Sequence, residues 1–383
     1  MKLYLTDYIA THPDWEEELA SYPYYLKISR DSRYILFMYQ LVPEKSDFSL
    51  PLVRECRGII LEDKTYKPVC IPFFKFFNYG EHEAAVIDWP RATVTQKIDG
   101  SLIKLWHGSD GWHLSTNKTI NAFNAKVNSV NYKSFGDVFM DAIAKYYSSI
   151  EVSNILNGLD QNLTYMFELT SRDTQVVVPY DLDVYFLGYR DNITGRECWG
   201  GHSILFNRLP RPKTYSLSSL QDVINAAAQL PYEEEGYVVF DEYFNRIKIK
   251  SPEYIKAHYL RNNNKMTWKR LIEVVMAGEE SEFLTYCADQ EYNIHQVKKW
   301  MIELKYHCFV AQYNVEKLCG KWLENIPKKD LAEVVNSMFE KRAYIRSYLF
   351  KVHDNPAITW EEFTVNWTAN DWLKNFKVEE CIT

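Results

Sequence analysis

Residues 236–250 read GYVVFDEYFNRIKIK, and this segment indicates the type of architecture most clearly. Its first five residues are rich in β-branched and aromatic side chains, and its last five alternate strictly between a cation and isoleucine. Successive side chains of a strand point to opposite faces. The pattern therefore predicts two strands, with both isoleucines of 246–250 facing the core and three cations on the other face: Arg246, Lys248 and Lys250.

Strand-like runs recur before this segment and stop after it. They are bounded by Gly, Asn, Asp or Pro and lie at residues 34–42, 102–106, 163–170 and 182–189. Two helices are predicted among them, at 14–20 and 135–147. Beyond residue 250 the apolar residues follow helical spacing, as at Val297, Trp300, Met301, Leu304 and Cys308.

Two capping-box-like pairs lie in this later part. Asp330 with Glu333 predicts the start of one long helix through residue 350, and Thr359 with Glu362 predicts the start of the last helix. We therefore predict an α+β fold, with antiparallel sheets and helices over residues 1–255 and an all-α domain over residues 256–383. No run of five short strands follows residue 250, so no OB-fold is expected.

Composition excludes several classes of protein. The 383 residues are 46% apolar and 25% charged, which excludes a disordered or fibrous chain. No apolar run approaches the ~18 residues that cross a bilayer, and the first residues carry no signal-peptide pattern, so we expect no membrane association. Seven scattered cysteines form no CxxC pair, which indicates reduced thiols in a cytoplasmic protein. With a net charge of −7, any phosphate site must be built from local cations.

Lys97 is a candidate nucleophile in the segment 97–101, KIDGS. A deprotonated lysine amine can attack the α-phosphate of a nucleoside triphosphate, provided that burial or nearby cations lower its pKa. The segment alone is a weak signal, because a surface turn after a strand can have the same sequence. The cations of 246–250 strengthen it, since two or three of them at ~6.6 Å intervals match a triphosphate. A half-solvated edge strand would carry lysines too.

Two carboxylates and two further cations lie inside apolar runs. Glu168 lies in YMFEL and Glu235 precedes GYVVF, so each is either at a rim or buried with a partner, and a metal ion or a ribose hydroxyl would suit both. Arg57 lies in ECRGI and Lys75 in FKFFN. The alternatives are that Arg57 pairs with a carboxylate and that Lys75 extends its ammonium to solvent.

Taken in order, the segments ECRG, FKFFN, KxDGS, a strand glutamate, EGYV and KIKS resemble the nucleotidyltransferase motifs of covalent polynucleotide ligases. The flanking residues most resemble the RNA ligase 1 family of T-even phages, over residues 30–260. The resemblance implies a nucleotidyltransferase (ATP-grasp-like adenylylation) domain in residues 1–255. It gives the helical part a role in recognising RNA, through groups such as Lys298, Lys299 and Trp300. The alternative is that the helical part only covers apolar surface of the core.

The resemblance also implies roles for the residues that contact the nucleotide. Lys97 resembles the lysine that becomes adenylylated. Arg57 and Lys75 resemble contacts to the nucleotide and its phosphates, and Tyr39 resembles a nucleotide-contacting tyrosine.

Four further residues resemble the family's catalytic groups. Glu168 resembles the strand glutamate that binds metal or ribose, and Glu235 resembles the glutamate of the metal-assisted chemistry. Lys248 and Lys250 resemble the final lysine pair. After the nucleophile the family has Ser or Lys, a basic residue and Gly, whereas residues 115–119 read STNKT. Lys118 is displaced by one position, so its role stays open.

The implied activity is that of an ATP-dependent RNA ligase. With ATP and Mg²⁺, or Mn²⁺ in its place, Lys97 takes AMP and passes it to an RNA 5′-phosphate, and a 3′-hydroxyl then seals the strand. The implied partners are RNA ends, for example in a nicked tRNA, and we expect a monomer encoded by a phage or a bacterium. Two alternatives stay open: a capping-type guanylyltransferase that uses GTP, and a non-catalytic RNA-end-binding protein.

Overall fold

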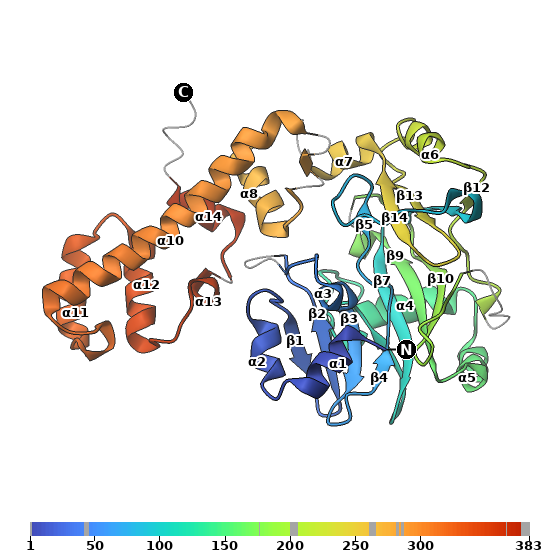
Figure 1. Cartoon of the computed structure of the whole chain (residues 1–383), viewed down its shortest axis with the longest axis horizontal. Coiled ribbons are helices and arrows are strands. Elements are labelled where there is room, and N and C mark those ends of the chain that lie inside the picture. The colour runs from blue at the N-terminus through green and yellow to red at the C-terminus, as the bar shows by residue number, and fades with distance from the viewer. Residues whose placement is uncertain are drawn as a thin grey trace. The chain divides into compact units, whose positions relative to one another are not determined.

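The computed structural model describes residues 2–41, 46–175, 177–199, 206–259, 266–280, 283–284, 287–364 and 366–376. The chain forms two compact units, residues 1–40 with 45–258 and residues 41–44 with 259–383 (Figure 1). All described strands belong to the first unit, and the described elements after Lys250 are helical. The predicted α+β class, with antiparallel sheets followed by a helical region, is confirmed.

Four antiparallel strands form the first sheet, in the spatial order β1-β2-β3-β4. The strand predicted over residues 34–42 ends at Met38, because the register shifts between Phe37 and Met38 and the Tyr39 amide then bonds to the Cys56 carbonyl at 2.7 Å. Residue 42 lies outside the described residues. The bounds are β1 Lys27–Arg30, β2 Tyr34–Met38, β3 Arg57–Glu62 and β4 Pro68–Cys70.

The second sheet has five antiparallel strands in the order β11-β10-β9-β7-β8. Its apolar face packs against helix α4 (Phe135–Ala144), where Phe139 meets Phe167 and other buried rings of the sheet. The bounds are β7 Ser101–Gly108, β8 Gly111–Ser115, β9 Leu163–Thr170, β10 Asp183–Asp191 and β11 Glu197–Cys198.

The third sheet has the order β12-β6-β13-β14-β5, with only the short β14–β5 pair parallel. As predicted, Ile247 and Ile249 are buried, and they pack with Val223 and Ala227 of helix α6 (Leu220–Ala227). The bounds are β5 Phe77–Asn78, β6 Thr93–Gln96, β12 Thr214–Tyr215, β13 Gly236–Phe240 and β14 Arg246–Lys250.

The remaining helices of the first unit lie around these sheets. The helix predicted over residues 135–147 is α4, which starts at the Ser134 hydroxyl bonded to the Asp137 amide at 3.1 Å and ends three residues earlier than predicted. The other bounds are α1 Tyr4–Thr11, α2 Trp15–Ala20, α3 Pro51–Glu55, α5 Ser149–Gly158 and α7 Pro252–Tyr259.

Helix α10, which runs through the second unit, buries one face formed by residues such as Val297, Leu304 and Cys308. Figure 1 shows α8 and α14 beside its first half and α11 and α12 beside its second half. The bounds are α8 Trp268–Ala277, α10 Glu291–Cys319, α11 Lys328–Met338, α12 Ala343–Asp354, α13 Trp360–Thr364 and α14 Ala369–Asn375.

Two helix predictions for this unit were wrong. The helix expected from Asp330 through residue 350 is two helices, α11 and α12. The break is possible because the Arg346 side chain donates to the Phe339 carbonyl at 2.7 Å, which satisfies a helix end. Thr359 and Glu362 do form a capping box, but α14 follows the helix that they start. Among the described residues, no helix combines the length and apolarity that a bilayer crossing needs.

Candidate active site

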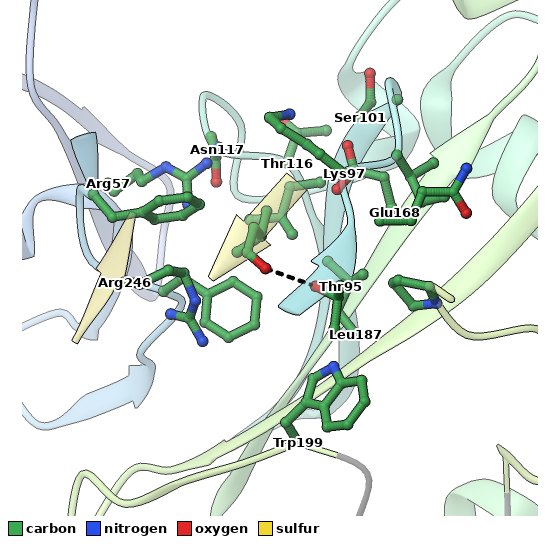
Figure 2. Close-up of a pocket in the computed structure, with 18 of the residues that line it drawn as sticks. Arg57, Thr95, Lys97, Ser101, Thr116, Asn117, Glu168, Leu187, Trp199 and Arg246 are labelled. Carbon is green, nitrogen blue, oxygen red and sulfur yellow. Dashed lines mark hydrogen bonds between the residues drawn. The ribbon is translucent and has the colours of Figure 1, made fainter. Parts of the chain in front are cut away.

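A cavity of about 610 Å³ lies in the first unit, lined from the second and third sheets and from the start of β3. Figure 2 shows its polar side chains around Lys97, with Arg57 and Asn117 on one side and Glu168 on the other. Trp199 lies with Leu187 at another part of the wall. The cavity thus has a cationic and carboxylate region beside an aromatic one, which suits a ligand with a charged part and a flat apolar part.

Lys97 lies in the connection between β6 and β7, and its neighbours fix that connection. The Lys97 amide donates to the Gly236 carbonyl at 2.8 Å. Asp99 is buried and accepts the amides of Val177 and Val178 at 2.8 Å each, and the Tyr254 hydroxyl at 2.9 Å. Asp99 therefore holds the loop in place.

Gly100 shows why glycine follows this aspartate. A Cβ atom there would lie 2.5 Å from the Leu169 carbonyl oxygen of β9, so no larger residue fits without moving the strand. The connection can lie this close to β9 only with glycine at this position.

The Lys97 amine forms an ion pair with buried Glu235, at 2.6 Å between Nζ and Oε2. Lys250 approaches the other carboxylate oxygen, with 3.4 Å between its Nζ and Oε1. Two predicted site cations thus share one predicted carboxylate, which directly follows from the pairing of Gly236 with Lys250 across β13 and β14. The carboxylate is placed to hold the Lys97 amine and to accept a proton from it.

Glu168 lies on β9 and lines the cavity. The pKa of its carboxyl is raised to about 7, mainly by burial. The charges of Lys97 and Arg57 oppose this rise, and those of Glu235 and Asp99 add to it. Within the described residues no hydrogen bond or ion pair holds this carboxylate. A recessed acceptor without a protein partner fits a metal ion, a metal-bound water or a ribose hydroxyl.

Arg57 opens β3 and reaches the cavity, with its guanidinium 5.2 Å from the centre of the Phe76 ring. Its Nη1 is buried and has no hydrogen-bond partner among the described residues, and the same holds for the Asn117 side-chain oxygen beside it (Figure 2). Buried polar atoms without partners are costly in a folded protein. An unpaired donor next to an unpaired acceptor therefore indicates a bound polar group at this wall.

A buried lysine supports the turn that carries Arg57. Lys104 of β7 is fully buried, and its amine donates to the Gly58 carbonyl at 2.5 Å. Its pKa is lowered to about 8, mainly by burial and to a smaller extent by the nearby charge of Arg57, while Cys70 opposes the shift. Gly58 has a φ of +82°, and a Cβ there would lie 2.7 Å from the Lys104 amine. Glycine is therefore required next to Arg57.

The glutamate of the ECRG segment has a structural task. Glu55 is buried and accepts the backbone amides of Tyr4 and Leu5 at 3.1 and 3.0 Å, at the start of α1. Burial raises its pKa to about 7. Glu55 and Gly58 thus fix the segment, and Arg57 is the member that reaches the cavity.

Tyr39 and Lys75, both expected to contact a nucleotide, do not line this cavity. The Lys75 ammonium lies 5.5 Å from the centre of the Tyr39 ring, 5.2 Å from that of Phe48 and 5.1 Å from that of Phe77. Lys75 lines a smaller pocket of about 170 Å³, which shares Phe76 and Arg246 with the main cavity. The structure places these two residues together, but beside the main site.

The three cations of β14 share one face as predicted, but they do not act alike. Arg246 is buried and pairs with Glu197 at 2.8 Å, and Arg190 bonds to the same carboxylate. Two arginines therefore share one carboxylate, and Glu197 offsets only part of their charge. Of the three cations, Arg246 lines the main cavity, whereas Lys248 and Lys250 are not among its lining residues. The Lys248 amine lies 5.8 Å from the centre of the Phe76 ring, which does line the cavity.

The sequence interpretation left Lys118 open and missed two other residues. Lys118 is exposed and lines the cavity, in a turn closed by the Thr116 and Thr119 hydroxyls at 2.8 Å. Asn117 and Lys104 were not predicted. A lysine within the apolar run 102–106 was the signal for Lys104, because a buried lysine needs a partner. Asn117 stands in an ordinary turn sequence and gave no signal.

Metal binding would rest on few protein ligands. Among the residues that the structure describes, no group of three or more His, Cys, Asp or Glu side chains could hold a metal ion. Mg²⁺ commonly keeps several waters and binds through one or two carboxylates together with substrate phosphates. Glu168 suits that mode, whereas Glu235 is occupied by Lys97 and Lys250.

A lysine on a cavity wall, paired with a carboxylate and flanked by cations, is what covalent nucleotidyl transfer requires. The RNA ligase family model matches residues 55–254, more than half of the 383-residue chain, so the chain belongs to the RNA ligase family of T4 RNA ligase 1. The predicted family is confirmed.

Several named proteins are similar to parts of this chain. A predicted bifunctional polynucleotide kinase/RNA ligase of Autographa californica nuclear polyhedrosis virus is 32% identical over 68% of this chain and 38% of that protein. A predicted RNA ligase of Thermovibrio ammonificans is 30% identical over 55% of each. The chain thus spans about half the length of these relatives or less. A solved archaeal ATP-dependent RNA ligase has a TM-score of 0.42 and 13% identity, over 76% of this chain and 80% of that one.

Proposed function

We propose that the protein is an ATP-dependent RNA ligase that joins an RNA 5′-phosphate to a 3′-hydroxyl. The observation that carries the proposal is the position of Lys97 on the wall of the cavity. Its amine pairs with the Glu235 carboxylate, and Lys250 approaches the other oxygen of that carboxylate. Family membership supports the same reaction class.

In the first step Lys97 attacks the α-phosphorus of ATP. A P–N bond forms, the P–O bond to pyrophosphate breaks, and pyrophosphate leaves. The amine must give up a proton, and the Glu235 carboxylate at 2.6 Å is the acceptor placed for it. Lys248, Lys250 and Arg57 offset the charge that develops on the phosphates.

A divalent cation, Mg²⁺ or Mn²⁺, supplies further neutralisation of the triphosphate when bound, and Glu168 is the residue that would hold it. The two unpaired polar atoms of Arg57 and Asn117 offer a donor and an acceptor for a phosphate oxygen and a hydroxyl. The flat base would use the aromatic region around Trp199.

In the second and third steps AMP moves from Lys97 to the RNA 5′-phosphate, and the 3′-hydroxyl of the other end displaces it. The Lys97–phosphorus bond breaks, a pyrophosphate-type bond to the RNA forms, and finally a phosphodiester replaces it with release of AMP. In this proposal the three reactions together repair broken RNA, such as a nicked tRNA. In this proposal residues 1–255 carry out adenylylation, and residues 256–383 recognise the RNA.

The test follows a label from nucleotide to protein to RNA. The protein is incubated with α-³²P ATP and Mg²⁺, and then with 5′-phosphorylated RNA. Labelled protein, then labelled RNA, then sealed product is the expected order. A label from GTP but not ATP would indicate a capping-type guanylyltransferase instead, and RNA binding without any covalent nucleotide would indicate a non-catalytic end-binding protein.

A further inference from the structure

Helix α10 of the second unit carries a row of large side chains that nothing in the described part of the chain covers. Its members are between 43% and 71% exposed: Tyr292, Ile302, Tyr306, Phe309 and Tyr313. Exposed rings gathered on one face of a helix commonly mark an interaction surface.

The spacing shows that this row is a true helix face. The buried row of α10 includes Ile294, Val297, Leu304, Cys308, Ala311 and Val315, and it packs into the second unit. On the other side the exposed row recurs at steps of three and four residues over 302–313, and exposed His295 and Lys299 continue it back to Tyr292, a span of about 32 Å at the helix rise. A surface helix normally puts polar residues there, whereas this one presents rings.

Charge on this exposed face favours an anionic partner. The exposed charged residues of α10 are three lysines and one acid, Lys298, Lys299, Lys317 and Glu291. Lys299 is paired with the partly exposed Glu303 at 3.8 Å, so the positive charge of the face is clearest at Lys317. The half-buried Glu316 is already engaged, because its Oε1 accepts the Leu323 amide at 3.2 Å. Beyond the helix, Lys321 and Trp322 are exposed as well.

We propose that this tyrosine–lysine face of α10, residues 292–322, binds single-stranded RNA by stacking unpaired bases on its rings and contacting phosphates with its lysines. Aromatic rings interleaved with cations are the means by which proteins hold unpaired nucleotides. A helical protein partner would need an uninterrupted apolar seam, and here His295 and Lys299 stand in the row. That the ligand is RNA rests on the proposed function.

Two of the three residues that the sequence favoured, Lys298 and Trp300, are less available than the rest of this surface. The Trp300 ring packs inward, 4.7 Å from the Trp268 ring and 5.1 Å from the Phe376 ring. Lys298 pairs with Glu280 at 2.8 Å. Neither side chain is as available to RNA as Tyr306, Tyr313 or Lys317, and no ion pair holds Lys317 among the described residues.

The experiment uses the full chain with the double substitution Tyr306→Ala/Tyr313→Ala and a fluorescein-labelled, unstructured 12-nucleotide RNA. Both side chains are exposed, so the melting temperature should not change. Loss of two stacking rings should weaken RNA binding at least about tenfold by fluorescence anisotropy. Labelling of the protein by ATP should stay at the wild-type level. The matched control is Tyr243→Ala, an equally exposed tyrosine of the first unit.

A salt titration gives a second, independent readout. Lys317→Gln should reduce the slope of log Kd against log salt by about 0.7, as expected for one lost phosphate contact to a single strand. Lys298→Gln should change it less, because that lysine is already paired.

Unchanged RNA affinity in the double variant, in a protein that still takes AMP and seals RNA, would overturn this inference and leave the proposed function standing. A change in oligomeric state with RNA affinity intact would also overturn it, in favour of a contact between copies. If the wild-type protein neither takes AMP nor seals RNA, the proposed function itself fails. Weaker binding to single-stranded RNA than to a duplex of equal length would contradict the stacking mode.

Discussion

Replacing Asp99 tests whether the aspartate of the KIDGS segment positions Lys97 or acts on the substrate. The Asp99 carboxylate accepts three hydrogen bonds, from two backbone amides at 2.8 Å and from the Tyr254 hydroxyl at 2.9 Å. A hydrogen bond to a charged group contributes about 1.5–3 kcal/mol. Asp99→Ala should therefore lower the free energy of unfolding by roughly 5 kcal/mol or more, a large part of the stability of a typical domain.

Two milder variants keep the test informative if Asp99→Ala does not fold. Asp99→Asn keeps an acceptor for both amides and a donor for the Tyr254 oxygen, and neutral bonds of about 0.5–1.5 kcal/mol each would replace charged ones. A loss of roughly 2–3 kcal/mol is expected. Tyr254→Phe removes one bond and should cost about 1.5–3 kcal/mol.

The assay is urea unfolding of each variant, together with the rate of covalent labelling by ATP. If Asp99 positions the loop, labelling should decline in the same order as stability, and Asp99→Asn should still take AMP. An Asp99→Asn protein with wild-type stability and no labelling would refute the positioning role and assign Asp99 to the chemistry.

Three further outcomes are expected. The pKa of Lys104 is lowered to about 8 in the folded protein, so between about pH 8 and 10.5 the unfolded chain binds more protons than the folded one. The free energy of unfolding, measured in urea, should therefore rise with pH over that range in the wild-type protein, and Lys104→Met should lose this rise. The pKa of Glu168 is raised to about 7 in the folded protein, so its contribution to stability is full below about pH 4.5 and declines as the pH rises through 7. At pH 8, Glu168→Gln should be more stable than the wild-type protein by up to about 3 kcal/mol and should yet take AMP from ATP more slowly. Equal stability of the two proteins at pH 8 would contradict the burial argument. Lys248→Ala and Lys250→Ala should each slow labelling by ~10²–10³ in a time course, whereas Ile247→Val should cost only about 0.5–1.5 kcal/mol of stability, and wild-type rates in both lysine variants would exclude a phosphate role.

The strands of the first unit were largely predictable because their signal is local. Residues 163–170, 236–240 and 246–250 form strands with the predicted bounds, since β-branched and aromatic residues favour pleated, buried backbone. Helix ends were less predictable. The break after Met338 depends on Arg346, whose side chain reaches back to the Phe339 carbonyl, and no periodicity shows such a contact.

Several of the predicted site residues lie together, but the sequence did not show their geometry. Lys97, Glu235 and Lys250 meet because β6, β13 and β14 are neighbours in one sheet. The ion pair between Arg246 and Glu197 links strands of two different sheets. The alternating sequence of residues 246–250 does not show this contact, because a strand with solvent-exposed lysines has the same pattern.

The central claim is that Lys97 carries the nucleotide, and one measurement tests it most directly. Wild-type protein and Lys97→Ala are incubated with α-³²P ATP, and both are then given RNA that already carries AMP on its 5′-phosphate. The account predicts no covalent label on Lys97→Ala, together with continued sealing of the pre-adenylylated RNA, because only the first step needs the amine. A covalent label that persists on Lys97→Ala would contradict the account.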